Sequence, residues 1–257
     1  MNLDKIMDVT KKASYEAGLE ILKIYNSDFE VDYKEDDSPL TKADTLSNEI
    51  LIDHLKQFNI PILSEESRDD LKRLDSEYVF IIDPLDGTKE FVKKNGEFTV
   101  NVGLVKNNKA ILGVIYAPVL DELYFGYKGD SYRKKGDEIT QLSVSSVKEI
   151  GDMSLVKSRS HASEKVNKIS SLFKETTSSG SSLKGCLVAK GESDCYIRIN
   201  PINEWDICAM CAIINNANGI STYSNGKEIQ FNQKDTLIKG FVVSNGKNHD
   251  EIINLVK

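Results

Sequence analysis

Two aspartates, Asp83 and Asp86, follow an apolar run at residues 78–82 and lie on either side of Pro84. The run predicts a buried strand that ends at Asp83, where Pro84 stops the hydrogen-bond ladder and Gly87 permits a sharp turn. Both carboxylates can then point into one small volume. Their repulsion there requires a cation, either a Lys or Arg side chain or a bound metal ion. An ordinary Asp-Pro turn without a site is the alternative interpretation.

Other acidic residues of the chain are candidates for the same site. Glu65 follows a short predicted strand at residues 61–63, so it lies beside the aspartate pair if the two strands are neighbours. Asp206 and Asp44 each stand at the start of a predicted helix, where a carboxylate stabilises the helix dipole or caps free N–H groups without any ligand. That helix-start role is the simpler interpretation of each residue taken alone.

Helices followed by strands make up the first half of the chain, residues 1–150. Helical periodicity predicts helices over residues 3–26 and from residue 44, joined by a polar connector with a loop signal at 36–39. Asn107 and Asn108 indicate the turn of a hairpin, and the expected antiparallel strands are 98–105, 110–117, 123–127 and 131–133. This order is typical of an α+β sub-domain.

Near residue 150 the pattern changes to alternating helices and strands, so residues 151–257 are expected to form a mixed α/β sub-domain. A cleft between the two sub-domains is the default place for a site. The expected elements are strand 153–156, helix 164–173, helix 181–190, strand 194–199, helix 204–216, strand 241–245 and helix 248–256.

Composition narrows the class of protein. The chain has 257 residues, 40% of them apolar, and a formal net charge of −7, so a nucleic-acid-binding surface is not expected. It has neither an apolar stretch long enough to span a bilayer nor a signal peptide, which predicts a cytoplasmic protein; peripheral attachment to the inner membrane face stays open, as does the oligomeric state. Cys208 and Cys211 form a C-x-x-C inside a buried helix, which favours small apolar thiols over a redox pair or a zinc site.

The chain resembles the inositol monophosphatase superfamily over nearly its whole length. The motifs in matching order and spacing are Leu63-Ser64-Glu65-Glu66, residues 83–88 (DPLDGT) and Trp205-Asp206. Longer strings resemble the bisphosphate nucleotidase branch of that superfamily: 83–91 (DPLDGTKEF), 95–101 (NGEFTVN), 113–118 (GVIYAP), 158–161 (SRSH) and 181–184 (SSLK). The resemblance implies a layered αβαβα sandwich and a lithium-sensitive, Mg²⁺-dependent phosphatase.

The same resemblance implies roles for individual residues. Two or three Mg²⁺ ions would be held by the carboxylates of Glu65, Asp83, Asp86 and Asp206 and by the Leu85 carbonyl, and all of these are hard oxygen ligands. Hydrolysis would be direct, with Thr88 and Asp44 positioning or deprotonating the attacking water and Glu65 assisting. The N–H groups at Gly87 and Thr88 would hold phosphate oxygens.

The implied substrate is a small-molecule nucleotide, adenosine 3',5'-bisphosphate, which would give AMP and phosphate; its sulfated form is a further candidate. The resemblance implies substrate contacts at Glu65, Leu85, Asp86, Gly87, Thr88, His161, Ser181, Lys184, Arg198 and Asp206. Alternatives are an inositol or sugar phosphatase, a non-catalytic nucleotide-sensing or metal-sensing module, and an enzyme that acts on short oligonucleotides. The SRSH and SSLK strings weigh against the inositol or sugar phosphatase, and the complete carboxylate set weighs against the non-catalytic module. The lack of a basic aromatic groove weighs against an enzyme that acts on oligonucleotides.

Overall fold

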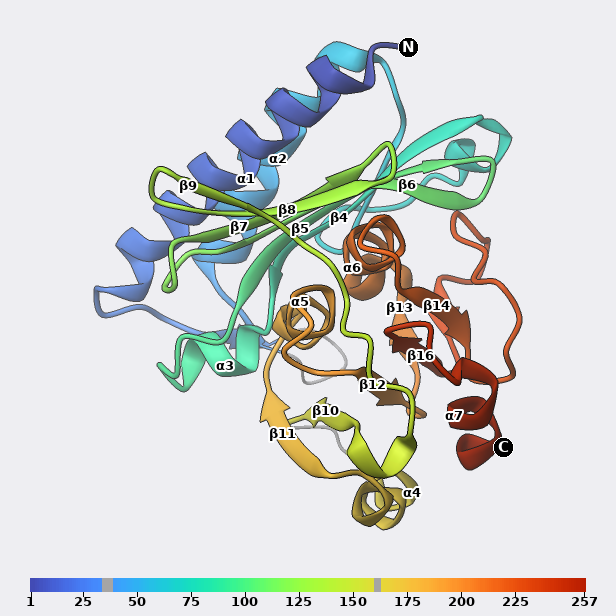
Figure 1. The fold of residues 1–257 in the computed structure, drawn as a ribbon. Helices are drawn as coiled ribbons and strands as arrows, with labels where there is room; N and C mark the ends of the chain where they lie inside the picture. Colours follow the sequence, from blue (N-terminus) through green and yellow to red (C-terminus); the bar gives the residue numbers. More distant parts are fainter. Residues whose placement is uncertain (34–38, 160–162) are drawn as a thin grey trace.

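The computed structural model describes residues 1–33, 39–159 and 163–257, and its helices and sheets alternate in five layers (Figure 1). Helices α1 (Leu3–Tyr25) and α2 (Lys42–Leu55) cover one face of the larger sheet. Helices α5 (Leu183–Ala189) and α6 (Glu204–Asn216) separate that sheet from a smaller one, and α4 (Glu164–Ile169) and α7 (His249–Val256) lie beyond it. The predicted αβαβα sandwich is confirmed.

The larger sheet has seven strands among the described residues, in the order β3-β4-β5-β6-β7-β8-β9. Its first pair, β3 with β4, is parallel, and every following pair is antiparallel. The predicted hairpin is present, with Asn107 and Asn108 both at positive φ in its turn. The strands are β3 (Ile62–Ser64), β4 (Tyr78–Asp86), β5 (Thr99–Lys106), β6 (Lys109–Ala117), β7 (Glu122–Tyr127), β8 (Asp130–Lys135) and β9 (Glu138–Gln141).

The smaller sheet is mixed, with five strands in the described chain in the order β11-β10-β12-β16-β14. Strand β10 pairs in parallel with β11 and β12, whereas β16 is antiparallel to β12 and β14. The strands are β10 (Ser154–Ser158), β11 (Glu175–Ser179), β12 (Cys195–Arg198), β14 (Ile220–Tyr223) and β16 (Phe241–Ser244). Strands of the larger sheet end before residue 142 and those of the smaller begin after 153. The division into sub-domains at residue 150 itself stays a prediction.

Two short antiparallel pairs complete the strands of the described residues: β1 (Asp32–Tyr33) with β2 (Pro39–Leu40), and β13 (Ile202–Asn203) with β15 (Leu237–Ile238). The loop predicted at 36–39 falls mostly on residues 34–38, outside the described residues. No helix that the structure describes combines the length and apolar character needed to cross a bilayer.

The helix starts follow local sequence. Asn2 caps α1 by accepting hydrogen bonds from the N–H groups of Asp4 and Lys5 at 3.1 Å. Thr41 and Asp44 form a capping box at the start of α2. The buried residues of α1 recur every three or four positions, so one face packs on the sheet.

Helix α6 lies unusually close to the larger sheet because glycines face it. A Cβ atom at Gly113 would lie 2.2 Å from the Ala209 carbonyl oxygen, and one at Gly103 would lie 2.4 Å from the Cys208 Sγ. Cys208 and Cys211 are buried in this helix as free thiols, which confirms the prediction that they pack as small apolar groups. The glycines therefore set the height of α6 above the sheet.

We expect Gly113→Ala to lower the free energy of unfolding by about 1–3 kcal/mol, because α6 must move to accommodate the methyl group. Urea denaturation measures this. Gly151→Ala is the matched control, since nothing lies within 4 Å of the added Cβ, and its effect should stay within about 0.5 kcal/mol. A Gly113→Ala protein as stable as the wild type would show that α6 is free to shift.

Candidate functional site

A β-bulge in β4 brings the aspartate pair onto one face of the sheet. Asp83 pairs with Asn101 and Asp86 pairs with Thr99, so three steps along β4 correspond to two along β5. Side chains three residues apart in a regular strand point to opposite faces, and the extra residue corrects this. The prediction that the strand ends at Asp83 is wrong: pairing resumes at Asp86, because Pro84, which lacks an N–H, falls within the bulge.

The turn after the bulge is held by α2 and by a short helix, α3 (Thr88–Val92). Gly87, just before α3, has φ +92°, and a Cβ there would lie 3.0 Å from the Glu97 carbonyl oxygen. The Thr88 hydroxyl lies 3.2 Å from both Asp44 Oδ1 and the Leu85 carbonyl oxygen. The Thr88–Asp44 proximity expected from the resemblance is thus present in the structure.

Asp206 reaches the same place from the start of α6. It forms a capping box with Asn203, whose backbone N–H donates to Asp206 Oδ2 at 3.0 Å. The Ser182 hydroxyl donates to the Asp206 carbonyl oxygen at 3.0 Å and so joins α6 to the segment before α5. Asp44 occupies the equivalent capping position in α2, so both residues keep their helix-start role and also face or approach the site.

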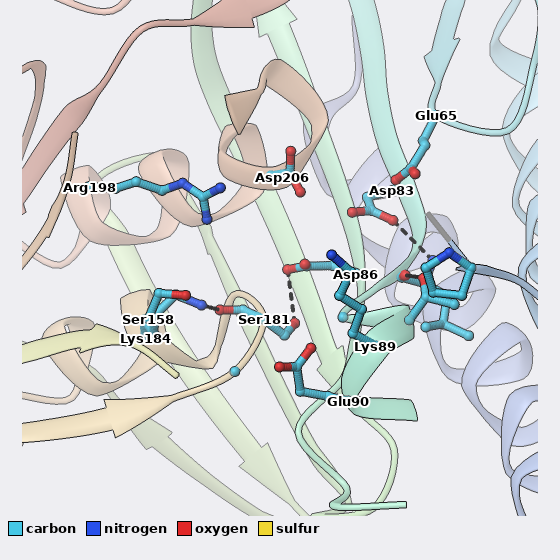
Figure 2. Close-up of a pocket in the computed structure, with 15 residues that line it drawn as sticks. Glu65, Asp83, Asp86, Lys89, Glu90, Ser158, Ser181, Lys184, Arg198 and Asp206 are labelled. Atoms are coloured by element: carbon cyan, nitrogen blue, oxygen red, sulfur yellow. Dashed lines mark hydrogen bonds between the residues drawn. The ribbon is translucent and has the colours of Figure 1, made fainter. Parts of the chain in front are cut away.

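One ligand oxygen from each of Asp83, Asp86 and Asp206 lies within 4.8 Å of the others. Glu65 follows β3, which pairs in parallel with β4, and it lines the same cavity of about 170 Å³. Figure 2 shows the four carboxylates around one end of this cavity, with Glu65 nearest to Asp83. The expected proximity of Glu65 to the aspartate pair is confirmed.

The electrostatics of the cluster fit a divalent cation. Burial, reinforced by the charges of Glu65 and Asp86, raises the pKa of Asp83 well above its ordinary value. Burial likewise raises the pKa of Asp206 to about 8. Asp83 Oδ2 is buried and has no hydrogen-bond partner among the described residues. A hard cation would satisfy that oxygen and offset the repulsion, so the carboxylates present suit such an ion.

Cationic side chains line the other end of the cavity. Lys184 is buried, donates a hydrogen bond to the Ser181 carbonyl oxygen, and lies over the Tyr196 ring at 5.3 Å. Burial lowers the pKa of Lys184 to about 8. Arg198 lies beside it and is held by the carbonyl oxygens of Asn200 and Pro201. The last expected contact, His161, lies outside the described residues.

Sequence reasoning missed the polar residues that support the cluster. The Asn101 side-chain amide donates to Asp86 Oδ2 at 3.2 Å and to the Ser182 hydroxyl at 2.9 Å. The Thr99 hydroxyl donates to Asn101 Oδ1 at 2.8 Å. Ser181, expected from the resemblance as a substrate contact, also supports the cluster, because its hydroxyl donates to Asp86 Oδ2 at 2.8 Å from a backbone with φ +49°. The sequence feature that could have revealed them is the presence of polar residues, Thr99 and Asn101, in the otherwise apolar and buried strand β5.

Comparison with known proteins agrees with this geometry. The model of the inositol monophosphatase family matches residues 2–257. The 3'(2'),5'-bisphosphate nucleotidase CysQ of Salmonella typhimurium is 36% identical, over 89% of this chain and 95% of that protein. The crystal structure of CysQ from Bacteroides thetaiotaomicron superposes with a TM-score of 0.84 at 36% identity, covering 95% of this chain and 98% of that one. An inositol monophosphatase from Anabaena gives 0.79 at 25% identity, covering 100% and 96%.

In metal-free protein kept in EDTA, we expect Asp206→Asn to melt at a higher temperature than the wild type at pH 8. The pKa of Asp206 in the folded protein is raised from 3.8 to about 8. The protonated side chain therefore stabilises the fold fully below pH 3.8, and this stabilisation is lost as the pH rises towards 8. The amide removes that loss and still accepts the capping hydrogen bond. Differential scanning fluorimetry from pH 5 to pH 8 measures the gap, which should widen with pH.

The exposed variant Asp137→Asn is the control and should show no such pH-dependent gap. If Asp206→Asn melted below the wild type at pH 8 without metal, the carboxylate would not be repelled by its neighbours and the case for a cation site would fail.

Proposed function

Because the chain belongs to the inositol monophosphatase family of metal-dependent phosphatases, we propose that it removes the 3'-phosphate of adenosine 3',5'-bisphosphate, giving AMP and phosphate. The observation that carries this proposal is a cavity in which Glu65, Asp83, Asp86 and Asp206 gather on one side and Lys184 and Arg198 lie on the other, with Lys89 and Glu90 also in the lining. A substrate with two phosphates can place one at each end, whereas an inositol monophosphate has a single anionic group.

We propose Mg²⁺, as two or three ions, for the acidic end of the cavity. The carboxylates of Glu65, Asp83, Asp86 and Asp206 would hold it, together with the Leu85 carbonyl oxygen. When bound, such ions offset the charge of the carboxylates and the phosphate and lower the pKa of the attacking water.

The residues that handle the proton of the attacking water would be Thr88 and Asp44. The Thr88 hydroxyl donates to Asp44 Oδ1 at 3.2 Å, so its oxygen lone pairs remain to accept a hydrogen bond from the water. Burial raises the pKa of Asp44, which makes it a better proton acceptor than an exposed aspartate. Glu65 lines the same cavity and would assist, while the N–H groups at Gly87 and Thr88 would contact phosphate oxygens.

Nucleotide selectivity would reside in the cationic end. Lys184, with a pKa near 8, is mainly protonated at neutral pH and would pair with the second phosphate beside Arg198. Ser181 would contact the nucleotide while its hydroxyl bonds Asp86 Oδ2, so it would link the substrate to the acidic cluster. His161 belongs to the same proposal through the family resemblance.

The deciding measurement compares kcat/KM for adenosine 3',5'-bisphosphate and inositol 1-phosphate in Mg²⁺, with released phosphate as the readout. We expect the nucleotide to be preferred by at least about 100-fold, because only it carries a second phosphate that can engage Lys184 and Arg198. A preference for the inositol phosphate would overturn the proposed substrate. Undetectable phosphate release from either compound would favour a non-catalytic role. The sulfated nucleotide, tested in parallel, measures how far the cavity tolerates a larger 5' group.

We expect Asp83→Asn to lower kcat by about a thousandfold or more, because loss of a charged metal ligand removes several kcal/mol of stabilisation. Its melting temperature without metal should not fall, since the amide replaces a buried carboxylate of raised pKa. Asp137→Asn serves as the exposed control. Near-normal turnover by Asp83→Asn would rule out an essential role for this carboxylate.

A further inference from the structure

Arg73 is a buried cation outside the cavity that the proposed mechanism does not use. It lies in the one-turn 3₁₀ helix Lys72–Asp75 and its side chain is only 2% exposed. Its guanidinium makes two hydrogen bonds to Asp69 Oδ2, at 2.8 and 3.0 Å. It also reaches across to a segment far along the chain, donating to Asn232 Oδ1 at 2.7 Å and to the Gln233 carbonyl oxygen at 2.9 Å.

The other side of this segment is held by a buried carboxylate. Glu204 is 1% exposed and accepts hydrogen bonds from the backbone N–H groups of Asn232 and Gln233, at 2.6 and 2.9 Å. The dipeptide 232–233 is therefore clamped between a guanidinium on its oxygen atoms and a carboxylate on its N–H groups. The Asn232 amide also donates to the Arg73 carbonyl oxygen at 3.1 Å, so Arg73 and Asn232 are joined by two hydrogen bonds of opposite direction.

The clamp joins the two segments that carry the outermost acidic residues of the cluster. Arg73 lies in the connection from β3 to β4, which begins at Glu65. Glu204 is the first residue of α6, two positions before Asp206. Through residues 232–233, the Glu65 loop and the start of α6 are thus tied together from behind, although these segments lie about 140 residues apart in sequence.

We propose that Arg73, Asn232 and Glu204 form a positioning clamp that fixes the segments carrying Glu65 and Asp206 relative to each other and so raises the affinity of the cluster for a divalent cation. The inference rests on the proposed function for the identity of the site, but concerns the affinity of the cluster for the cation itself. Two acidic arms repel in the absence of an ion, and an ionic clamp behind them limits how far they part. Partners behind the ligands commonly change metal affinity by about 10- to 100-fold.

A purely structural anchor is the competing explanation. Buried ion pairs often stabilise a fold no better than apolar residues of the same size, so stability alone gives little reason for this arrangement. The two explanations differ in one measurable respect. An anchor affects the melting temperature, whereas a positioning clamp also shifts the affinity for Mg²⁺ in protein that remains folded.

The test uses Asn232→Gly with Asn248→Gly as its matched control. Both asparagines have positive φ, +59° and +51°, so glycine introduces no backbone strain in either. Both lose side-chain hydrogen bonds, but the Asn248 amide donates to the Lys148 carbonyl oxygen, at the start of α7 and outside the lining of the cavity. Titration calorimetry measures binding of Mg²⁺ alone to each full-length protein, without nucleotide.

We expect Asn232→Gly to raise the Kd for Mg²⁺ about tenfold, and Asn248→Gly to leave it within about twofold of the wild type. Arg73→Met should raise the Kd for Mg²⁺ further, and Arg73→Lys should raise it less than Arg73→Met does. If Arg73→Met does not fold, the Kd of Asn232→Gly still decides. An unchanged Kd in Asn232→Gly overturns the clamp.

Phosphate release from adenosine 3',5'-bisphosphate is measured separately. If the wild type binds Mg²⁺, Asn232→Gly weakens that binding and neither hydrolyses the nucleotide, the clamp stands and the proposed function fails. If the wild type hydrolyses the nucleotide and Asn232→Gly binds Mg²⁺ as tightly, the function stands and the clamp fails.

Discussion

Repulsion between buried carboxylates is the constraint that the fold around this site must satisfy. Asp83 and Asp206 both have raised pKa values because burial removes water and their neighbours carry the same charge. Fixed geometry holds these mutually repelling groups close together. A bulge in β4, capping boxes at α2 and α6, and the Asn101 amide each hold one acidic side chain or its backbone in place.

Much of this arrangement could be predicted from sequence because it depends on local signals. Periodicity predicted the limits of α1 and α6, and turn residues predicted the hairpin at Asn107 and Asn108. Family motifs predicted the layered fold. The bulge could not, since a proline between two aspartates is typical of a strand that ends. Strand β11 was missed because its residues, ETTSS, are mostly exposed and show no apolar alternation. The Arg73 clamp joins segments about 160 residues apart, and no local pattern reports such a pairing.

The cavity combines residues from both halves of the sequence. The strand and turn residues come before residue 100, whereas Ser181, Lys184, Arg198 and Asp206 follow residue 180. Helix α6 rests directly on Gly103 and Gly113 of the larger sheet, through the Cys208 side chain and the Ala209 backbone, so the height of Asp206 above Asp83 depends on this close packing. Acidic and cationic ends therefore keep a fixed separation, which suits a ligand with two anionic groups better than one with a single group.

The capping box at α6 also limits how Asp206 can interact with an ion. Asp206 Oδ2 accepts the hydrogen bond of the Asn203 N–H, which leaves Oδ1 without a role in the cap. Asp44 is used in the same way, with Oδ2 on Thr41 and Oδ1 on Thr88. A carboxylate that already accepts a hydrogen bond on one oxygen is favoured to bind an ion through its other oxygen. If each acidic residue gave a bound cation a single oxygen, the cation would keep room for exchangeable oxygen donors such as water, which turnover needs and a saturated storage site does not.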